Sequence, residues 1–218
     1  MFAVLGCLVA GLERKGNKVR FIEMQESILN LFNTKKLIKG GAKKNVWKSL
    51  IKCQHFGSAS EDDLSAYLEE KIFPDRPEIN TNPQLKMAIQ LCVAEIFRNA
   101  FVHGACRELF ISHFFSVYNK KLFITVVNQG KSIKDTARAG SNSSVGAIKW
   151  AVENGTTSRT SEHNGIGLHT IRQFVQQNQG KIQIMSGDAV WKQVKHRTFS
   201  KNYEKAFPGT IVTLEFNI

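Results

Sequence analysis

Three polar residues recur at helical spacing in an otherwise apolar stretch, Leu85–Gly104. Glu95, Asn99 and His103 lie four residues apart, so in a helix they would stack along one side. A buried carboxylate and carboxamide need polar partners, and a bound ion, water molecule or ligand is one candidate. The alternative is that Glu95 and Asn99 lie at a water-exposed edge. His103, a lone histidine, is more consistent with packing or with lining a pocket.

A second candidate is the glycine pair in N-G-I-G-L, Asn164–Leu168, which opens a helical pattern. Gly165 and Gly167 would leave backbone N–H groups free and let a phosphate chain approach the positive end of the helix dipole. It is not a dinucleotide-binding fingerprint, because a polar loop precedes it and Thr170 stands where a third glycine belongs. A plain turn at the start of a helix is the alternative.

Two further motifs complete a series along the chain: V-V-N-Q-G-K-S-I at Val126–Ile133 and P-G-T-I-V-T-L-E-F at Pro208–Phe216. Together with E-x-x-x-N-A-x-x-H and G-x-G-L, in this order, they resemble the N box, the two glycine boxes and the last strand of the GHKL superfamily. This superfamily groups gyrase B subunits, heat-shock chaperones, sensor histidine kinases and mismatch-repair ATPases. The resemblance covers Thr81–Ile218, about two thirds of the chain.

The resemblance implies a histidine kinase-like ATP-binding domain of the Bergerat fold, with ATP and Mg²⁺ as cofactors. Asn99 would bind Mg²⁺ together with triphosphate oxygens, and Glu95 would orient or deprotonate the water that attacks the γ-phosphate. The polar loop Thr156–Asn164, with Arg159 and His163, would form a flexible lid. The remaining residues that the resemblance places at the nucleotide are His103, Asn128, Gly130, Gly165, Ile166, Gly167, Leu168 and Thr210.

The first glycine box departs from the family pattern at two positions. Asn128 stands where an aspartate normally accepts a hydrogen bond from the adenine amino group, and Ser132 replaces the second glycine. An amide oxygen can still accept that bond, but the amide is neutral and could flip to present a donor. Both changes put nucleotide affinity and base selectivity in question.

The elements that would position these residues fall into two parts. Residues 1–57 are expected to form an αβα piece and a connector: a helix, a strand at Lys18–Met24, a second helix through Leu37, and an exposed connector from Gly40 to Gly57. This part has some likeness to half of a STAS domain. Residues 58–218 would form the ATP-binding domain, whose central helix starts at the N-cap Asn82 with Pro83 at its first position.

Within the second part, the patterns predict a helix capped by Ser60, another capped by Ser143 or Ser144, and a third after Gly167. The expected strands are Glu108–Val117, Lys121–Val127, Lys181–Met185, Ala189–Val194 and Thr210–Phe216, with a tight hairpin turn at Ser186–Asp188. This mixture predicts an α/β fold, a two-layer sandwich of helices and a mixed, mostly antiparallel sheet.

Composition constrains the partners. The chain has 218 residues, a formal charge of +12 and a pI near 9.7, which favours anionic partners. Nucleic acid is not the favoured partner, because the basic residues are scattered and no nucleic-acid-binding module is present.

The four cysteines form no C-x-x-C pair, and the apolar Met1–Leu12 is too short to span a bilayer. The expectation is a cytoplasmic protein that does not bind membranes and contains a core helix at its N-terminus.

Three functions remain open on the sequence. The first is an ATP-binding protein that hydrolyses ATP or uses it as a conformational switch. The second is a serine/threonine kinase resembling the anti-sigma-factor kinases. The third is a degenerate domain that has lost the nucleotide and only recruits a protein partner, such as a STAS-like protein or a regulatory factor. A homodimer is compatible with each.

Overall fold

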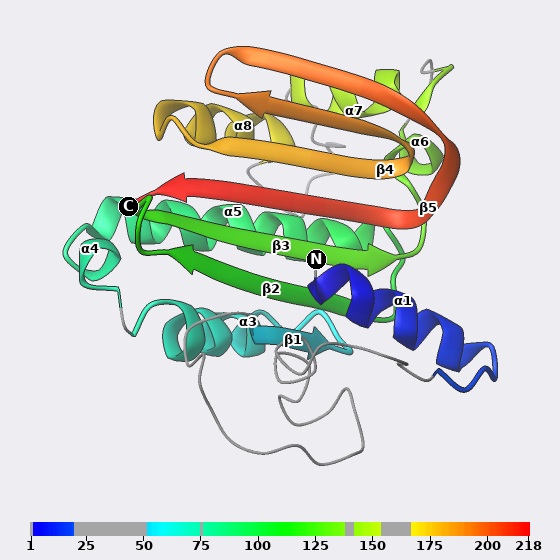
Figure 1. The fold of residues 1–218 in the computed structure, drawn as a ribbon, viewed down its shortest axis with the longest axis horizontal. Coiled ribbons are helices and arrows are strands. Elements are labelled where there is room, and N and C mark those ends of the chain that lie inside the picture. The colour runs from blue at the N-terminus through cyan, green and yellow to red at the C-terminus, as the bar shows by residue number, and fades with distance from the viewer. Residues whose placement is uncertain (1, 20–51, 75, 138–141, 154–166) are drawn as a thin grey trace.

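The computed structural model describes residues 2–19, 52–74, 76–137, 142–153 and 167–218 (Figure 1). Its strands form one five-stranded sheet in the order β1-β2-β3-β5-β4, and every neighbouring pair is antiparallel. The expected α/β class is therefore confirmed, and no parallel pair occurs in the sheet of the described residues. The strands are β1 (Lys52–Phe56), β2 (Leu109–Ser116), β3 (Lys121–Gln129), β4 (Lys181–Val194) and β5 (Arg197–Asn217).

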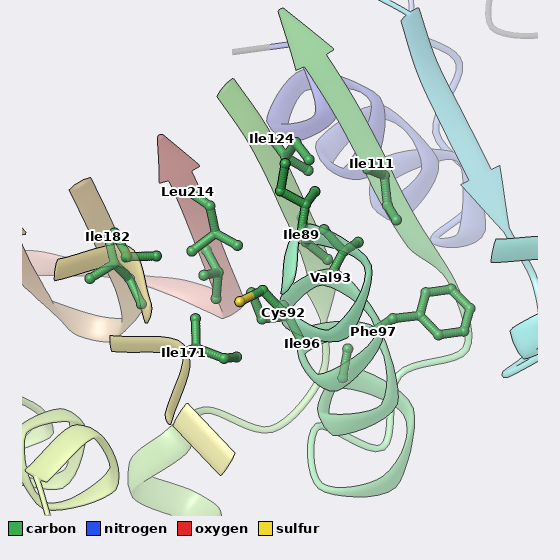
Figure 2. Close-up of a cluster of buried hydrophobic side chains, with 14 of the residues drawn as sticks. Ile89, Cys92, Val93, Ile96, Phe97, Ile111, Ile124, Ile171, Ile182 and Leu214 are labelled. Atoms are coloured by element: carbon green, nitrogen blue, oxygen red, sulfur yellow. The ribbon is translucent and has the colours of Figure 1, made fainter. Parts of the chain in front are cut away.

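A layer of helices covers one face of the sheet. In Figure 2, Ile89, Val93 and Ile96 of the central helix lie near Ile124 and Leu214 of the sheet. These side chains belong to one buried cluster, which makes the molecule a two-layer sandwich. The helices of the second part are α3 (Glu61–Tyr67), which continues as the π-helix η1 (Leu68–Ile72), then α4 (Pro77–Asn80), the central helix α5 (Pro83–Val102), α6 (Ile133–Thr136), α7 (Ser144–Glu153) and α8 (Gly167–Gln177).

The opposite face of the sheet carries the helix α1 (Phe2–Arg14), which lies against β2 and β3 (Figure 1). Ala3 and Cys7 are buried there with Phe110 and Val127 in a second, smaller apolar cluster. The prediction of an N-terminal core helix is confirmed. No helix among the described residues combines the length and the apolar character needed to cross a membrane.

Local capping signals predicted several helix starts correctly. The side chain of Asn82 accepts a hydrogen bond from the backbone N–H of Leu85, and Pro83 begins α5. The side chain of Ser60 accepts from the N–H of Asp63, and that of Ser143 accepts from the N–H of Gly146. Each cap satisfies a donor that the first turn of a helix leaves without an intrahelical partner.

Two structural predictions are wrong. The end of the expected connector is strand β1, which pairs with β2 at the edge of the sheet. The expected hairpin turn at Ser186–Asp188 is instead a β-bulge, with Gly187 at a φ of 59°, through which β4 continues. The turn lies at Lys195 and His196, because Val194 pairs with Arg197. β5 consequently begins thirteen residues before the predicted strand, in polar sequence that gave no strand pattern.

Several predictions fall outside the described residues. These are most of the strand at Lys18–Met24 and the whole helix through Leu37. Both α1 and β1 belong to the first 57 residues and contact the same sheet. The division of the chain at residue 57 stays a prediction.

Candidate functional site

The polar stripe of α5, made by Glu95, Asn99 and His103, lies on the flank of that helix nearer to α8. In Figure 2, Cys92 points toward Ile171 of α8, whereas Phe97 points to the other side. Asn99 follows Cys92 by seven residues, close to two helical turns, and therefore shares its side of the helix. Glu95 is 5% exposed and Asn99 is half-buried, so the carboxylate does not lie at a water-exposed edge.

The neighbours of Glu95 on α5 supply its polar partners. Nδ2 of Asn99 donates to Oε1 of Glu95 at 3.0 Å, and Nη1 of Arg98 donates to Oε2 at 3.3 Å. Because an ionised carboxylate only accepts hydrogen bonds, the amide nitrogen of Asn99 must face Glu95 and its oxygen must face away. Asn99 Oδ1 makes no hydrogen bond within the described part of the chain. That oxygen is the atom a hard cation would take.

A row of polar residues crosses three strands near the C-terminal end of α5. Asn128 of β3 pairs with Thr210 of β5, which pairs with Ser186 of β4. Directly paired residues share a face of the sheet, and this face is the one that packs on α5, because Ile124 and Leu214 lie on it. The row therefore forms a polar border to an otherwise apolar layer, and Asn128 and Ser186 are buried in it.

Two of the three residues in this row bond to each other. Ser186, 1% exposed, has its Oγ 2.8 Å from Oγ1 of Thr210 and also accepts from the N–H of Ile133 at 2.8 Å. Thr210 is thereby held by β4 at the position where the resemblance puts the adenine. Ser186 was predicted to lie in a hairpin turn and not at a site, although a serine that alternates with Ile182 and Ile184 on a buried face was a usable signal.

Asn128 is the unsatisfied member of the row. It is 4% exposed, and its Nδ2 has no hydrogen-bond partner within the described residues. Gly104 lies against it: a Cβ at Gly104 would come within 2.9 Å of this nitrogen. A buried amide donor without a partner costs about 1–3 kcal/mol and is uncommon in native proteins. An acceptor atom supplied by a ligand would remove that cost.

The loop after Asn128 is wedged between α5 and β5. The N–H of Lys131 donates to the carbonyl of Gly104 at 2.8 Å, and the N–H of Gly130 donates to the carbonyl of Pro208 at 3.1 Å. A Cβ at Gly130 would overlap the carbonyl oxygen of Gly104. Glycine is needed here because two backbones meet, which is how a glycine box also lets a ligand approach the chain.

Helix α1 holds this loop from the other face of the sheet. Gln129 points away from α5, and its Nε2 donates to the carbonyl of Cys7 at 3.1 Å. Nη2 of Arg14 donates to Oε1 of Gln129 at 2.9 Å. The N-terminal helix therefore fixes the residue between Asn128 and Gly130.

Ser132, in the place of the second family glycine, has a structural role. Its side chain caps α6 by accepting from the N–H of Asp135, and its own N–H and hydroxyl donate to the Asp135 carboxylate. These hydrogen bonds lower the pKa of Asp135 below its ordinary value. Ser132 and Asp135 together form a capping box at the start of α6.

The remaining predicted site residues are spread around this end of α5 and α8. His103 is exposed and forms the C-cap of α5. Gly167 is the first residue of α8, at a φ of 71°, and Leu168 packs half-buried on the main core. Gly165, Ile166, Arg159 and His163 lie outside the described residues, so the predicted phosphate loop and lid stay predictions.

No protein-family model matches the chain, and no curated protein matches it. The described residues contain no group of three histidine, cysteine, aspartate or glutamate side chains that could hold a metal ion. An open polar cavity of about 610 Å³ lies at the other end of β3, where Lys121, Asn178 and Asn217 line it. None of the predicted site residues borders that cavity.

Proposed function

We propose that this chain binds ATP with Mg²⁺ in the manner of the GHKL superfamily, between α5, the loop after β3 and the start of α8. The observation that carries the proposal is the buried amide of Asn128, whose Nδ2 lacks a partner within the described residues. It lies beside Gly104, at the strand position where the family binds the base, and this donor would pair with an acceptor such as a ring nitrogen of adenine rather than with the amino group. The motif order alone would be weaker support.

The polar stripe of α5 supports the triphosphate end of the proposal. Glu95 lies about two helical turns, roughly 10 Å, before the end of α5 at Val102, so the carboxylate is well separated from the Asn128 amide beside Gly104. The free oxygen of Asn99 would share a magnesium ion with phosphate oxygens. Glu95 would orient or deprotonate the attacking water. Bound ATP supplies the γ-phosphate, and the chain positions it.

A second function, binding of a protein partner without turnover, is favoured by one observation. Glu95 is already engaged by Arg98, and Arg98 is in turn held by Glu61 of α3. Both carboxylate oxygens of Glu95 already accept hydrogen bonds, from Arg98 and Asn99, and these bonds compete with the orientation of an attacking water molecule. In that case the nucleotide would act only as a conformational switch or be absent.

Calorimetric titration of the purified chain with ATP, with and without Mg²⁺, tests the proposal. We expect magnesium-dependent binding that Asn99→Ala weakens at least about tenfold, because one metal ligand is lost. Asn119→Ala, in the exposed turn between β2 and β3, is the matched control and should bind like the natural chain. Equal affinities for Asn99→Ala and Asn119→Ala would refute the magnesium assignment.

Asn128→Asp distinguishes the two functions. Binding by the natural chain supports a working site, and assays of phosphate release and of phosphate transfer to a candidate protein then separate hydrolysis from kinase activity. Binding only by Asn128→Asp would support a nucleotide pocket that now serves a partner. Absence of binding by both would show that the ATP proposal is wrong.

A further inference from the structure

The outer half of the β4–β5 hairpin forms a two-stranded ribbon that extends beyond the bulge at Gly187. From Arg197 to Asn202, β5 pairs with β4 alone and not with β3, and the ribbon lies beside α7 and α8 (Figure 1). Trp191 and Gln193 on its inner face are 0% and 3% exposed. Nε of Arg172, on α8, donates to Oε1 of Gln193 at 2.6 Å. The ribbon is thus firmly anchored on one face.

The pairing of β4 with β5 shows which side chains lie on the outer face of this ribbon. Lys192 pairs with Phe199, Val194 with Arg197, and Val190 with Lys201, so these side chains lie opposite Trp191. Phe199 is 50% exposed, with Nζ of Lys192 5.0 Å from its ring centroid. Tyr203 is 45% exposed, with Nζ of Lys201 5.3 Å from its ring centroid. We call this surface, made by Lys192, Arg197, Phe199, Lys201 and Tyr203, the outer ribbon face.

The ribbon is strongly basic. Between Ala189 and Phe207 the sequence contains Lys192, Lys195, Arg197, Lys201 and Lys205 but a single acid, Glu204. None of these five cations forms an ion pair within the described residues. The sequence alone showed scattered basic residues, and the pairing of β4 with β5 brings several of them onto one surface.

We propose that the outer ribbon face binds single-stranded nucleic acid. Lysine and arginine side chains that lack protein carboxylates as partners can contact phosphates. Exposed aromatic rings beside them provide stacking platforms for unpaired bases, which a duplex keeps stacked and cannot offer. On binding, the ammonium groups that now lie over the rings would move to phosphates. An acidic protein would use the cations but would leave the two rings without a specific role.

Fluorescence anisotropy with the full chain and a fluorescein-labelled fifteen-nucleotide oligothymidylate or oligouridylate tests this inference. A duplex of the same length and a labelled poly-glutamate peptide are the competing ligands. We expect binding to the single strands to be tighter than to either competitor. Equal or tighter binding of the duplex, preferential binding of the peptide, or no binding of the single strands would each overturn the proposal.

Two double variants separate stacking from charge. Phe199→Ala with Tyr203→Ala should weaken binding at least about tenfold without changing its salt dependence. Arg197→Ala with Lys201→Ala should flatten the log–log salt slope by about 1.4, since each phosphate contact on a single strand contributes about 0.7.

Lys15→Ala with Lys18→Ala removes equal charge next to α1 and should leave affinity and slope unchanged. An aromatic variant that binds like the natural chain would show that the proposed stacking is wrong. Far-ultraviolet circular dichroism checks that each variant is folded.

Discussion

Nη1 of Arg98 lies 3.3 Å from Oε2 of Glu95, three residues earlier in α5. The same guanidinium binds the Glu61 carboxylate through Nε and Nη2, at 3.1 and 3.0 Å. Glu61 is the first residue of α3 and is largely exposed, whereas Glu95 is buried. The orientation of the candidate catalytic carboxylate is therefore coupled to a neighbouring helix through one arginine.

Glu95→Gln should keep ATP affinity within about threefold and lower phosphate release at least about a hundredfold, because the amide keeps the shape but cannot take a proton. Glu78→Gln, on the exposed face of α4, is the matched control and should hydrolyse ATP at the natural rate. A steady-state phosphate-release assay with calorimetric affinities provides both quantities. Undiminished release by Glu95→Gln would remove Glu95 from the catalytic role.

Ser186→Ala should lower the free energy of unfolding by about 1–3 kcal/mol, because the N–H of Ile133 and the hydroxyl of Thr210 lose their buried partner. Ser200→Ala, on the exposed outer strand, should change it by less than about 0.5 kcal/mol. Urea unfolding of both variants measures the difference. Equal stabilities would mean that the polar row contributes nothing to the fold.

Gly130→Ala should destabilise the fold by about 2 kcal/mol or more, since a methyl group would overlap the carbonyl oxygen of Gly104 and force two backbones apart. At Gly57 an added Cβ would be no closer than 4.0 Å to its neighbours, so Gly57→Ala is the control and should be nearly neutral. Thermal unfolding by circular dichroism compares the two. An unchanged unfolding temperature for Gly130→Ala would show that the loop after β3 can shift at little cost in free energy.

The free energy of unfolding should fall at alkaline pH, because the four cysteine thiols are shielded from water in the folded chain. Burial raises the pKa of Cys7, Cys53 and Cys92 from 9.0 to about 12 and that of Cys106 to about 11. The unfolded thiols ionise near pH 9 while the folded ones stay neutral. This contribution to stability is fully present below pH 9 and is lost as the pH rises toward about 12.

The test is urea unfolding at pH 8 and pH 10.5. Lysine and tyrosine also titrate in this range, so Cys92→Ala is compared with the natural chain. The variant should lose less stability between the two pH values, by about 1–2 kcal/mol, because one thiol no longer contributes. Parallel losses would contradict the burial argument for Cys92.

The sequence predicted those parts of the fold that depend on local chemistry. These parts are the helix caps at Ser60 and Asn82 and the buried side of α5. Each depends only on side chains that lie within one or two helical turns of one another. The bulge at Gly187 resembled a hairpin turn because glycine serves both, and only the pairing with β5 distinguishes them. The contact of α1 with Gln129 joins residues more than a hundred positions apart. No local pattern could reveal it.

The candidate site was predicted less completely. The position of Glu95 and Asn99 on one side of α5 followed from helical periodicity, whereas Asn128 was singled out only through the family resemblance. Arg98, the partner of Glu95, was not identified, although its i,i+3 spacing on α5 was a usable signal. Ser186, the partner of Thr210, was not identified because only the pairing of β4 with β5 brings the two residues together. The effect of Ser132 on nucleotide affinity stays a prediction, and its role as the cap of α6 was not predicted.

The sheet order β1-β2-β3-β5-β4 places the last strand of the chain in its interior. Until residues 209–217 are synthesised, β3 lacks one neighbour, the first half of β4 (Lys181–Ser186) lacks its own, and no hydrogen bonds join the two halves of the sheet. A nascent chain can form the β2–β3 hairpin early, but it cannot close the sheet cotranslationally before β5 emerges from the ribosome. The exposed edge of β3 would meanwhile be open to pairing with other chains, so a pause in translation before residues 209–217 would favour aggregation.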